Sequence, residues 1–237
     1  MRAPTDNGRG RIPVSQDTVR HIQQMLLQGE LKPGDRLPSQ RDLSIRLRIS
    51  RTSLREALSV LEVLGLLRTE PGRGTFVANG AVAESAEPRK WRFAGKHSEQ
   101  DVYELRYVLE GHAARLAAAA ISATQLQELQ HCCDAMHTAI GERDLVAASF
   151  KDFEFHALLM RFSGNRLFLE IQRILRDLVL ESQRLPMALH TRLKEPLDEH
   201  GRILAALERR DPEAAAAATQ DHIRRAAARV GIDLRSA

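Results

Sequence analysis

The chain has 237 residues, 43% of them hydrophobic, and its 35 Lys and Arg against 31 Asp and Glu give a formal net charge of +4. This length permits two domains. No apolar stretch approaches membrane-spanning length and no charged leader precedes an apolar run, which favours a soluble, cytoplasmic protein without a membrane partner. The only cysteines, Cys132 and Cys133, are adjacent and lack metal-finger spacing, so we expect buried, reduced thiols without a catalytic role.

The positive charge is concentrated in the first third of the chain. Residues 1–80 carry 13 Lys and Arg against 8 Asp and Glu, a net charge of +5, whereas the rest carries 22 against 23, a net charge of −1. Such a basic segment favours DNA as a partner, but the excess is small, so the placement of individual arginines matters more than bulk charge. Residues 1–11 are predicted to form a disordered arm.

Residues 37–77 have the pattern of a winged helix-turn-helix. Ser39 begins a capping box, with Asp42 in the place where Glu or Gln is more usual, and a short helix follows. Ser50 restarts the helix, and leucines then recur at the helical period. The sequence Pro-Gly-Arg-Gly at 71–74 lies between two short strand-like segments, which predicts a β-hairpin with a flexible tip. Two short helices and a basic hairpin are suited to placing one helix in a groove of DNA.

Polar residues occupy the first turns of the second helix, the part of a recognition helix that reaches base edges. Arg bonds a guanine bidentately, while Thr and Ser bond either bases or phosphates. Taken singly, each arginine fits a solvated helical face equally well, but the capped helix, the restarted helix and the Gly-tipped hairpin together favour DNA. The residues predicted to contact DNA are Arg41, Arg51, Thr52, Ser53, Arg55 and Arg73.

Residues 79–98 form a predicted linker, whose Trp91 and Phe93 are suited to dock against one of the domains. The rest of the chain has an Ala- and Leu-rich helical pattern without a strand signal, which predicts an all-α bundle. Asn165, as an N-cap, and Asp211, followed by proline, mark two of the helix starts. About six helices are predicted, over residues 99–120, 123–140, 143–163, 165–185, 193–209 and 212–230.

Three histidines and an aspartate stand out in this helical half. Asp152 and His156 are four residues apart, so both project from the same face of one predicted helix. His200 lies on an apolar stripe of the fifth predicted helix, and His222 lies on the sixth. If these side chains converge, one carboxylate and three imidazoles suit Zn²⁺, Mn²⁺ or Ni²⁺. The spacing alone fits histidines of an ordinary core equally well.

The first half closely resembles the DNA-binding domain of the GntR superfamily of bacterial transcription regulators. The match runs through Leu37-Pro38-Ser39, Ser50-Arg51-Thr52-Ser53-Leu54-Arg55-Glu56-Ala57-Leu58 and Pro71-Gly72-Arg73-Gly74-Thr75-Phe76. The resemblance implies that Arg41, Arg51 and Arg55 are the main DNA-contacting arginines. Thr52 and Gly72, at the tip of the wing, would assist them.

Two residues depart from that family pattern. Gln40 replaces the usual Glu, which we expect to affect only local pairing. Arg48 stands where the turn between the two helices normally has Gly. If that residue must be left-handed, its side chain costs roughly 1–2 kcal/mol, and the turn would then bend differently.

The helical half resembles the ligand-binding FCD domain of the FadR-like branch of the same superfamily. The matching residues are Tyr103-Glu104-Leu105-Arg106, Leu109-Glu110, Asp152-Phe153-Glu154-Phe155-His156, Ser163-Gly164-Asn165, Glu199-His200, Ile203 and His222. In metal-binding members, an Asp and a His four apart, plus one His from each of two later helices, hold one divalent ion. The resemblance implies one ion per chain, with Zn²⁺ preferred to Mn²⁺ or Ni²⁺. Its ligands would be Asp152, His156, His200 and His222.

An ion held in this way keeps open coordination positions and residual positive charge, which suits a small organic acid. Arg106 is the candidate for a second contact with the carboxylate, because a guanidinium binds carboxylates bidentately. A salt bridge from Arg106 to Glu104 or Glu110 on a solvated face explains this arginine equally well. Related proteins sense lactate, pyruvate, glycolate or sugar acids, and no residue here selects among them.

The sequence therefore predicts a winged helix-turn-helix domain at 12–78, a linker at 79–98 and an all-α effector domain at 99–232. The resemblance implies a homodimer that binds an inverted repeat in operator DNA, typically as a repressor relieved by a metabolite. The rival hypothesis is a metal-dependent hydrolase or lyase in the helical domain. Glu154 is the only acid nearby in sequence to act as its base, and no nucleophile motif or phosphate-binding Gly loop accompanies the cluster. An architectural nucleic-acid binder has no use for a buried ion.

Overall fold

The computed structural model describes residues 14–78, 91 and 93–234. Two compact units are found by their internal contacts. We call them the N-terminal unit, residues up to 62 with 66–79, and the helical unit, residues 63–65 with 80 onward. The predicted arm at 1–11 and most of the predicted linker lie outside the described residues. No helix among the described residues is both long and apolar enough to cross a membrane.

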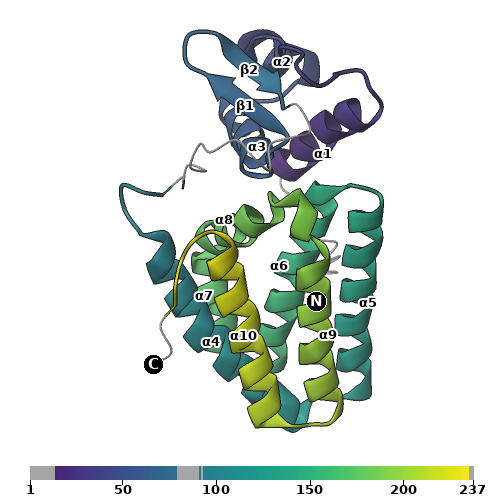
Figure 1. The fold of residues 1–237 in the computed structure, drawn as a ribbon, viewed down its shortest axis with the longest axis vertical. Helices are drawn as coiled ribbons and strands as arrows, with labels where there is room; N and C mark the ends of the chain where they lie inside the picture. Colours follow the sequence, from purple (N-terminus) through teal and green to yellow (C-terminus); the bar gives the residue numbers. More distant parts are fainter. Residues whose placement is uncertain (1–13, 79–90, 92, 235–237) are drawn as a thin grey trace, which may run out of the picture. The chain divides into compact units, whose positions relative to one another are not determined.

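The N-terminal unit consists of three helices and a two-stranded antiparallel hairpin (Figure 1). Its core is formed by apolar side chains that recur at the helical period, such as Ile22, Leu43 and Leu54. The strands pair in register from Leu67 opposite Val77 to Glu70 opposite Gly74. The elements are α1 (Val14–Leu27), α2 (Gln40–Leu47), α3 (Arg51–Val63), β1 (Leu67–Glu70) and β2 (Gly74–Val77). The predicted winged helix-turn-helix is confirmed.

The tip of the hairpin is a tight turn defined by its sequence. The Arg73 N–H donates to the carbonyl of Glu70 at 3.0 Å, which closes a four-residue turn around Pro71 and Gly72. Gly72 has a φ of +74°, the left-handed value that the third position of a type II turn requires, and proline favours the second position. The wing tip therefore needs glycine at Gly72 for its backbone geometry.

Arg48 ends α2 in the left-handed conformation, with φ 54° and ψ 43°. Its N–H donates to the carbonyl of Ile45 at 3.2 Å, and the Ile49 N–H donates to the carbonyl of Ser44 at 3.1 Å. This pair of bonds is the Schellman motif, which normally has glycine in the left-handed position. The turn is therefore not bent around the arginine, and Arg48 adopts the conformation that glycine would have.

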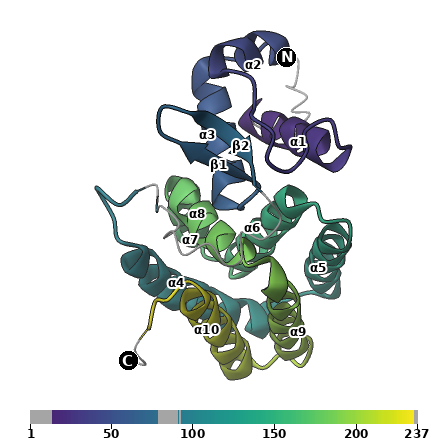
Figure 2. The ribbon, with the colours of Figure 1, turned by 45° about the horizontal axis from the view of Figure 1, so that its top comes forward.

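The helical unit contains seven α-helices and one short 3-10 helix (Figures 1 and 2). The α-helices are α4 (Glu99–Ala120), α5 (Ala123–Gly141), α6 (Leu145–Phe162), α7 (Arg166–Ile174), α8 (Arg176–Met187), α9 (Lys194–Glu208) and α10 (Pro212–Arg229). The 3-10 helix, η1, spans His190–Arg192. α10 packs along α4 and α9, and α5 packs along α6. Both buried cysteines lie on α5 and form no disulfide.

Small residues bring α4 and α10 close together. Ala113, Ala114 and Ala117 on α4 are fully buried, as is Ala215 on α10. At Gly111 the approach is closest, since a Cβ atom there would lie 2.7 Å from Cγ of Gln220. The alanine-rich composition is therefore explained by close helix packing.

The count of about six helices needs one correction, because the predicted helix 165–185 is two helices. The chain leaves helical geometry at Leu175, with φ −93° and ψ +10°. On α7, Leu167 and Ile174 are exposed, whereas every residue of α8 from Val179 to Met187 is buried. One straight helix would not satisfy these two environments, and its continuous helical pattern gave no sign of the break.

Helix starts follow their capping residues. Asn165 accepts from the Leu167 N–H at 3.0 Å and Asp211 from the Ala214 N–H at 3.0 Å, so both predicted caps are confirmed. Ser98 and Ser122 form full capping boxes at the starts of α4 and α5. Side-chain caps satisfy backbone N–H groups that have no partner within the helix.

The aromatic pair predicted to dock is Trp91 and Phe93, whose rings meet edge to face with centroids 5.5 Å apart. The Trp91 indole N–H donates to the carbonyl of His97 at 2.6 Å. Trp91 belongs to a buried apolar cluster with Val102 of α4 and Leu185 of α8. This aromatic pair therefore docks against the helical unit.

The strained turn gives a first prediction. Replacing Arg48 by glycine removes a left-handed side chain, which costs about 1–3 kcal/mol in the native state, and this gain exceeds the extra chain entropy of glycine. We expect Arg48→Gly to raise the unfolding free energy by about 1 kcal/mol, measured by thermal denaturation. Arg46→Gly, two residues earlier within α2, is the matched control and should lower it by about 1 kcal/mol. A lower melting temperature for Arg48→Gly would contradict the strain.

Candidate functional site

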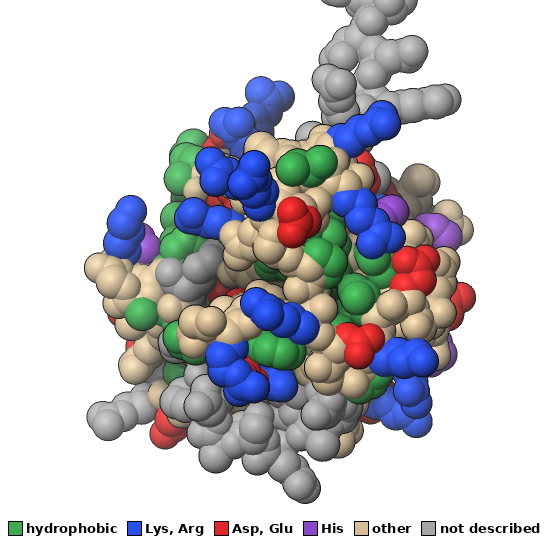
Figure 3. Space-filling view, turned by 90° about the horizontal axis from the view of Figure 1, so that it is seen from above, with side chains coloured by type: hydrophobic (Ala, Val, Ile, Leu, Met, Phe, Trp, Pro, Cys, Tyr) green, Lys and Arg blue, Asp and Glu red, His purple; other side chains and the backbone are tan. Residues whose placement is uncertain are grey.

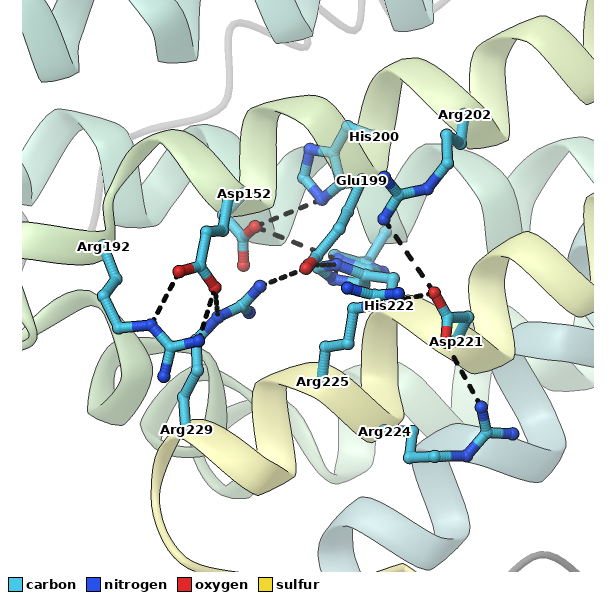
Figure 4. A network of polar contacts seen from close by, with 12 residues as sticks. Asp152, Arg192, Glu199, His200, Arg202, Asp221, His222, Arg224, Arg225 and Arg229 are labelled. Atoms are coloured by element: carbon cyan, nitrogen blue, oxygen red, sulfur yellow. Dashed lines mark hydrogen bonds and ion pairs between the residues drawn. The ribbon is translucent and has the colours of Figure 1, made fainter.

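The structure brings the four predicted metal ligands together in the interior of the helical unit. Asp152 and His156 come from α6, His200 from α9 and His222 from α10. One ligand atom from each lies within 4.8 Å of all the others, and all four residues are buried. Figure 4 shows Asp152, His200 and His222 directed toward one another. Because α6 is helical here, the four-residue spacing places its two ligands on one face.

The closest contact in the cluster joins two imidazoles. His222 Nε2 lies 3.1 Å from His156 Nε2. The carboxylate is nearby, with Asp152 Oδ1 at 3.4 Å from His200 Nε2 and at 4.0 Å from His156 Nε2. Neither ring nitrogen of His200 has a hydrogen-bond partner among the described residues. Unpartnered polar atoms in a dry interior are costly, so this cluster favours a bound group.

Two buried carboxylates contact the far nitrogens of these imidazoles. His222 Nδ1 is hydrogen-bonded to Glu199 Oε2 at 2.8 Å, which places the proton on Nδ1. His156 Nδ1 lies 2.7 Å from Glu110 Oε2, although the oxygen is off the ideal N–H direction. With protons on both Nδ1 atoms, the two Nε2 atoms face each other as lone pairs. A cation between them turns this repulsion into attraction.

Each carboxylate is in turn held by an arginine. Arg106 Nε donates to Glu110 Oε1 at 2.8 Å, and Arg106 Nη1 donates to Ser182 Oγ at 3.1 Å. Arg229 forms a close ion pair with Glu199 through Nη2. Figure 4 shows Glu199 between His222 and Arg229. Two chains of contacts, Arg106–Glu110–His156 and Arg229–Glu199–His222, thus end at the metal cluster.

Burial and neighbouring charges set the protonation of the site. Burial lowers the pKa of His200 well below its usual value, and His222 and His156 lower it further. Burial, with His156 second, likewise lowers the pKa of His222. Burial raises the pKa of Glu110, but Arg106 and His156 outweigh it and hold the pKa well below its usual range. Neutral imidazoles are the form that binds metal.

The donor set fits a divalent ion. Metal bonds to nitrogen and oxygen of about 2.0–2.2 Å place the ligand atoms of one ion at most about 4.4 Å apart. The observed spread of 4.8 Å closes to that value with small side-chain shifts. Three imidazoles, one carboxylate and two outer carboxylates that orient the rings are what zinc and related ions require.

Arg106 pairs with Glu110, one of the two partners considered from the sequence, but the pair is buried rather than solvated. The side chain of Arg106 is 2% exposed. Glu104 accepts from Gln100 instead, at 2.8 Å. Arg106 also lines a small cavity that includes Asp152 and His222. It therefore lies beside the metal cluster, although Glu110 already engages part of its guanidinium.

The residues predicted to contact DNA are mostly exposed. Arg41 lies in the first turn of α2, while Arg51, Thr52 and Arg55 are exposed at the start of α3. Ser53 is half-buried, and its hydroxyl is hydrogen-bonded to that of Ser50 at 2.9 Å, so it takes part in the start of the helix.

At the wing, Arg73 has a side chain that is 74% exposed and forms a close ion pair with Glu70. Its guanidinium lies over the ring of Phe76, 5.7 Å from the centroid. Gly72 is exposed beside it. Figure 3 shows basic side chains gathered at several places on the face that it presents, with fewer acidic ones between them.

Sequence reasoning missed the residues that surround the metal cluster. Glu199 precedes His200 directly and Glu110 follows Arg106 by four residues, so both had a weak local signal. Arg229 had none, because its contact with Glu199 joins α10 to α9.

Two family descriptions match the chain. Residues 14–77 match the family of bacterial regulatory proteins called gntR, and residues 101–225 match the FCD domain. The chain belongs to the GntR family. It is thus a DNA-binding transcription regulator with a helix-turn-helix and an effector-binding FCD domain.

Similar proteins are also regulators. The Glc operon transcriptional activator of Escherichia coli K12 is 31% identical over 90% of this chain and 87% of its own. The HTH-type transcriptional regulator LutR of Bacillus subtilis is 29% identical, over 84% and 93%. A solved structure of a GntR regulator from Rhodococcus sp. RHA1 has a TM-score of 0.51 at 20% identity, covering 93% of this chain and 99% of its own, and supports the fold.

The enzyme hypothesis loses its support. The relatives are transcription regulators and not enzymes. Glu154, the acid considered as a catalytic base, is exposed on α6 and pairs with Lys151 at 2.7 Å. It therefore lies on the solvent side of the helix that carries Asp152 and His156.

The two shells of the cluster give a second prediction. We expect His200→Ala to abolish stoichiometric binding of Zn²⁺, because it removes a ligand. Glu199→Gln should weaken binding about 10–100-fold, because the ring of His222 loses its anionic partner. Glu154→Gln, exposed on the same helix as two ligands, is the control and should leave the affinity unchanged. Competition with a chromophoric chelator measures the three constants, and wild-type affinity in His200→Ala would rule out the cluster as the site.

Proposed function

We propose that this regulator binds one divalent ion in its helical unit and that a small organic acid at that ion controls its affinity for operator DNA. The observation that carries the proposal is the pair of Nε2 atoms of His156 and His222, 3.1 Å apart. Zn²⁺ suits the set of three imidazoles and one carboxylate best, with Mn²⁺ and Ni²⁺ as alternatives. A bound ion supplies a positive centre that attracts a carboxylate. Since its target is bacterial DNA, we place the protein in the cytoplasm.

Arg106 supports a carboxylate ligand. It lines the cavity beside Asp152 and His222, and its Nε atom and part of its Nη edge are held by Glu110 and Ser182. A guanidinium fixed in this way is oriented in advance and still has free N–H groups for a bidentate contact. We therefore assign Arg106 as the protein side of the carboxylate contact.

DNA recognition is assigned to the exposed face of the N-terminal unit. Arg51, Thr52 and Arg55 project from the first turns of α3, and Arg41 and Arg73 flank them from α2 and the wing. A helix-turn-helix with one recognition helix per chain binds an inverted repeat as a dimer. Like most regulators of this family, the protein would act as a repressor that its effector releases.

The dimer interface is assigned to a face of α4 and α7, occupied by a second copy of the chain. Val108 on α4 is 62% exposed, and Leu167 and Ile174 on α7 are 69% and 75% exposed. The two helices meet where the rings of His112 and Phe168 lie 5.9 Å apart. Large apolar residues gathered on neighbouring helices are typical of an interface.

For DNA we expect Arg51→Ala and Arg55→Ala each to weaken operator binding by about 1–3 kcal/mol, because each removes a bidentate base contact. Arg166→Ala, an exposed arginine at the start of α7, is the control and should bind normally. Fluorescence anisotropy with operator and scrambled DNA measures both affinity and specificity. Unchanged specificity in both variants would remove these arginines from base recognition.

The dimer face gives its own prediction. We expect the double variant Val108→Glu with Ile174→Glu to sediment as a monomer, because it places like charges on an apolar interface. Leu27→Glu, on the exposed apolar side chain of α1, is the control and should stay dimeric. Analytical ultracentrifugation distinguishes these states, and a monomeric wild type would contradict the assignment.

The proposed function is tested by reciprocity. An effector changes operator affinity only through its different affinity for two arrangements of the protein, typically by about 5–150-fold. Operator DNA must then change the affinity of the metal-loaded protein for that acid by the same factor. Calorimetric titration of lactate, pyruvate and glycolate, with and without operator, measures this. An acid that binds tightly and equally in both cases would show that the site is not a sensor.

A further inference from the structure

The cavity beside the metal cluster has a polar wall that the cluster does not use. It is lined by Asp152 and His222, by Arg106, and on the opposite side by Gln183 and Arg229. Pro186, Met187 and Pro196 supply an apolar border. The free space is about 10 Å³, room for one water molecule, so a ligand of several atoms must displace part of the wall.

Gln183 on α8 is 4% exposed, and neither its amide nitrogen nor its amide oxygen has a hydrogen-bond partner in the described part of the chain. Leaving a buried amide unpaired is unfavourable, by about 1–3 kcal/mol. A ligand group that donates to the oxygen, or accepts from the nitrogen, recovers this free energy. Gln183 therefore offers a neutral donor and acceptor at the cavity.

Arg229 offers a second donor. Its Nε donates to Glu195 at 2.9 Å and its Nη2 pairs with Glu199, but Nη1 is buried without a partner in the described residues. The two carboxylates fix the guanidinium, which orients the remaining N–H groups. A neutral oxygen of a ligand is suited to accept from them.

The buried charges limit the charge of the ligand. Arg106 and Arg229 are opposed by Glu110, Asp152 and Glu199, and all five are buried. With these groups ionised, one divalent ion makes the net charge +1. One carboxylate neutralises it, whereas a second would leave a buried excess of negative charge, which is costly in a low-dielectric interior.

We propose that Gln183 is a specificity-determining residue and that the effector is a monocarboxylate bearing a neutral hydrogen-bonding group, such as a hydroxyl or a carbonyl. The carboxylate binds on the side of the metal cluster and Arg106. The neutral group binds the Gln183 amide and Arg229 Nη1. This inference rests on the proposed function and adds the chemical class of its ligand.

The test is calorimetric titration of the full-length, zinc-loaded protein with four three-carbon acids: propanoate, 2-hydroxypropanoate, 2-oxopropanoate and propanedioate. Wild type should bind the hydroxy or the oxo acid about tenfold more tightly than propanoate, a gain of one buried hydrogen bond, and propanedioate more weakly than either. Gln183→Met, which keeps the size of the side chain, should remove that preference and leave propanoate binding and zinc content unchanged.

Two further variants complete the test. Gln172→Met is the matched control, because Gln172 is also 4% exposed but lines a cavity that includes none of the four metal ligands. Its preferences should equal those of wild type. Gln183→Glu introduces a negative charge and should weaken binding of all four acids.

The possible failures are distinguishable. If Gln183→Met keeps the wild-type preference, or if propanedioate binds most tightly, the role of Gln183 is wrong while a carboxylate sensor stands. If none of the four acids binds zinc-loaded wild type, the proposed carboxylate function fails, and this inference fails with it.

Discussion

The helical unit depends on two imidazole nitrogens that face each other in a dry interior. His156 and His222 come from different helices, and each is turned by a carboxylate that contacts its far nitrogen. Arginines hold those carboxylates in place. Without a cation, the arrangement sets lone pair against lone pair, which is unfavourable in a low dielectric. Binding specificity is thus prepared by the fold before any ligand arrives.

The four ligands come from α6, α9 and α10, and the outer carboxylates come from α4 and α9. Anything bound at the centre therefore touches, directly or through one residue, four helices of the bundle. A group that binds only the folded state adds stability in proportion to its occupancy. The same connection allows a small change at the centre to be felt by several helices at once, which is what a sensor needs.

Local patterns predicted much of this correctly. The helix-turn-helix follows from Ser39, Ser50 and their apolar spacing, and the pair Asp152 and His156 follows from the helical repeat. The convergence of four ligands came from a family resemblance, because spacing within one helix says nothing about its neighbours. The break at Leu175 was missed, since it answers to burial that differs along the chain.

The partners of the centre were harder still to predict. Arg229 and Gln183 acquire their meaning only from residues distant in sequence, which they meet through helix packing. Arg106 was ambiguous because its candidate partners on the same helix are equally spaced for solvated and for buried pairing. In both cases a local signal existed only where the contact was within one helix.

One missing methyl group gauges the width of the centre. Gly111 follows Glu110 directly, and the residue it meets across the helix interface, Gln220, lies two positions before His222. Any side chain at Gly111 would wedge α4 and α10 apart at the level where one supplies an outer carboxylate and the other a ligand. A glycine that touches neither ion nor effector thus acts as the spacer that keeps both shells of the site within reach of each other.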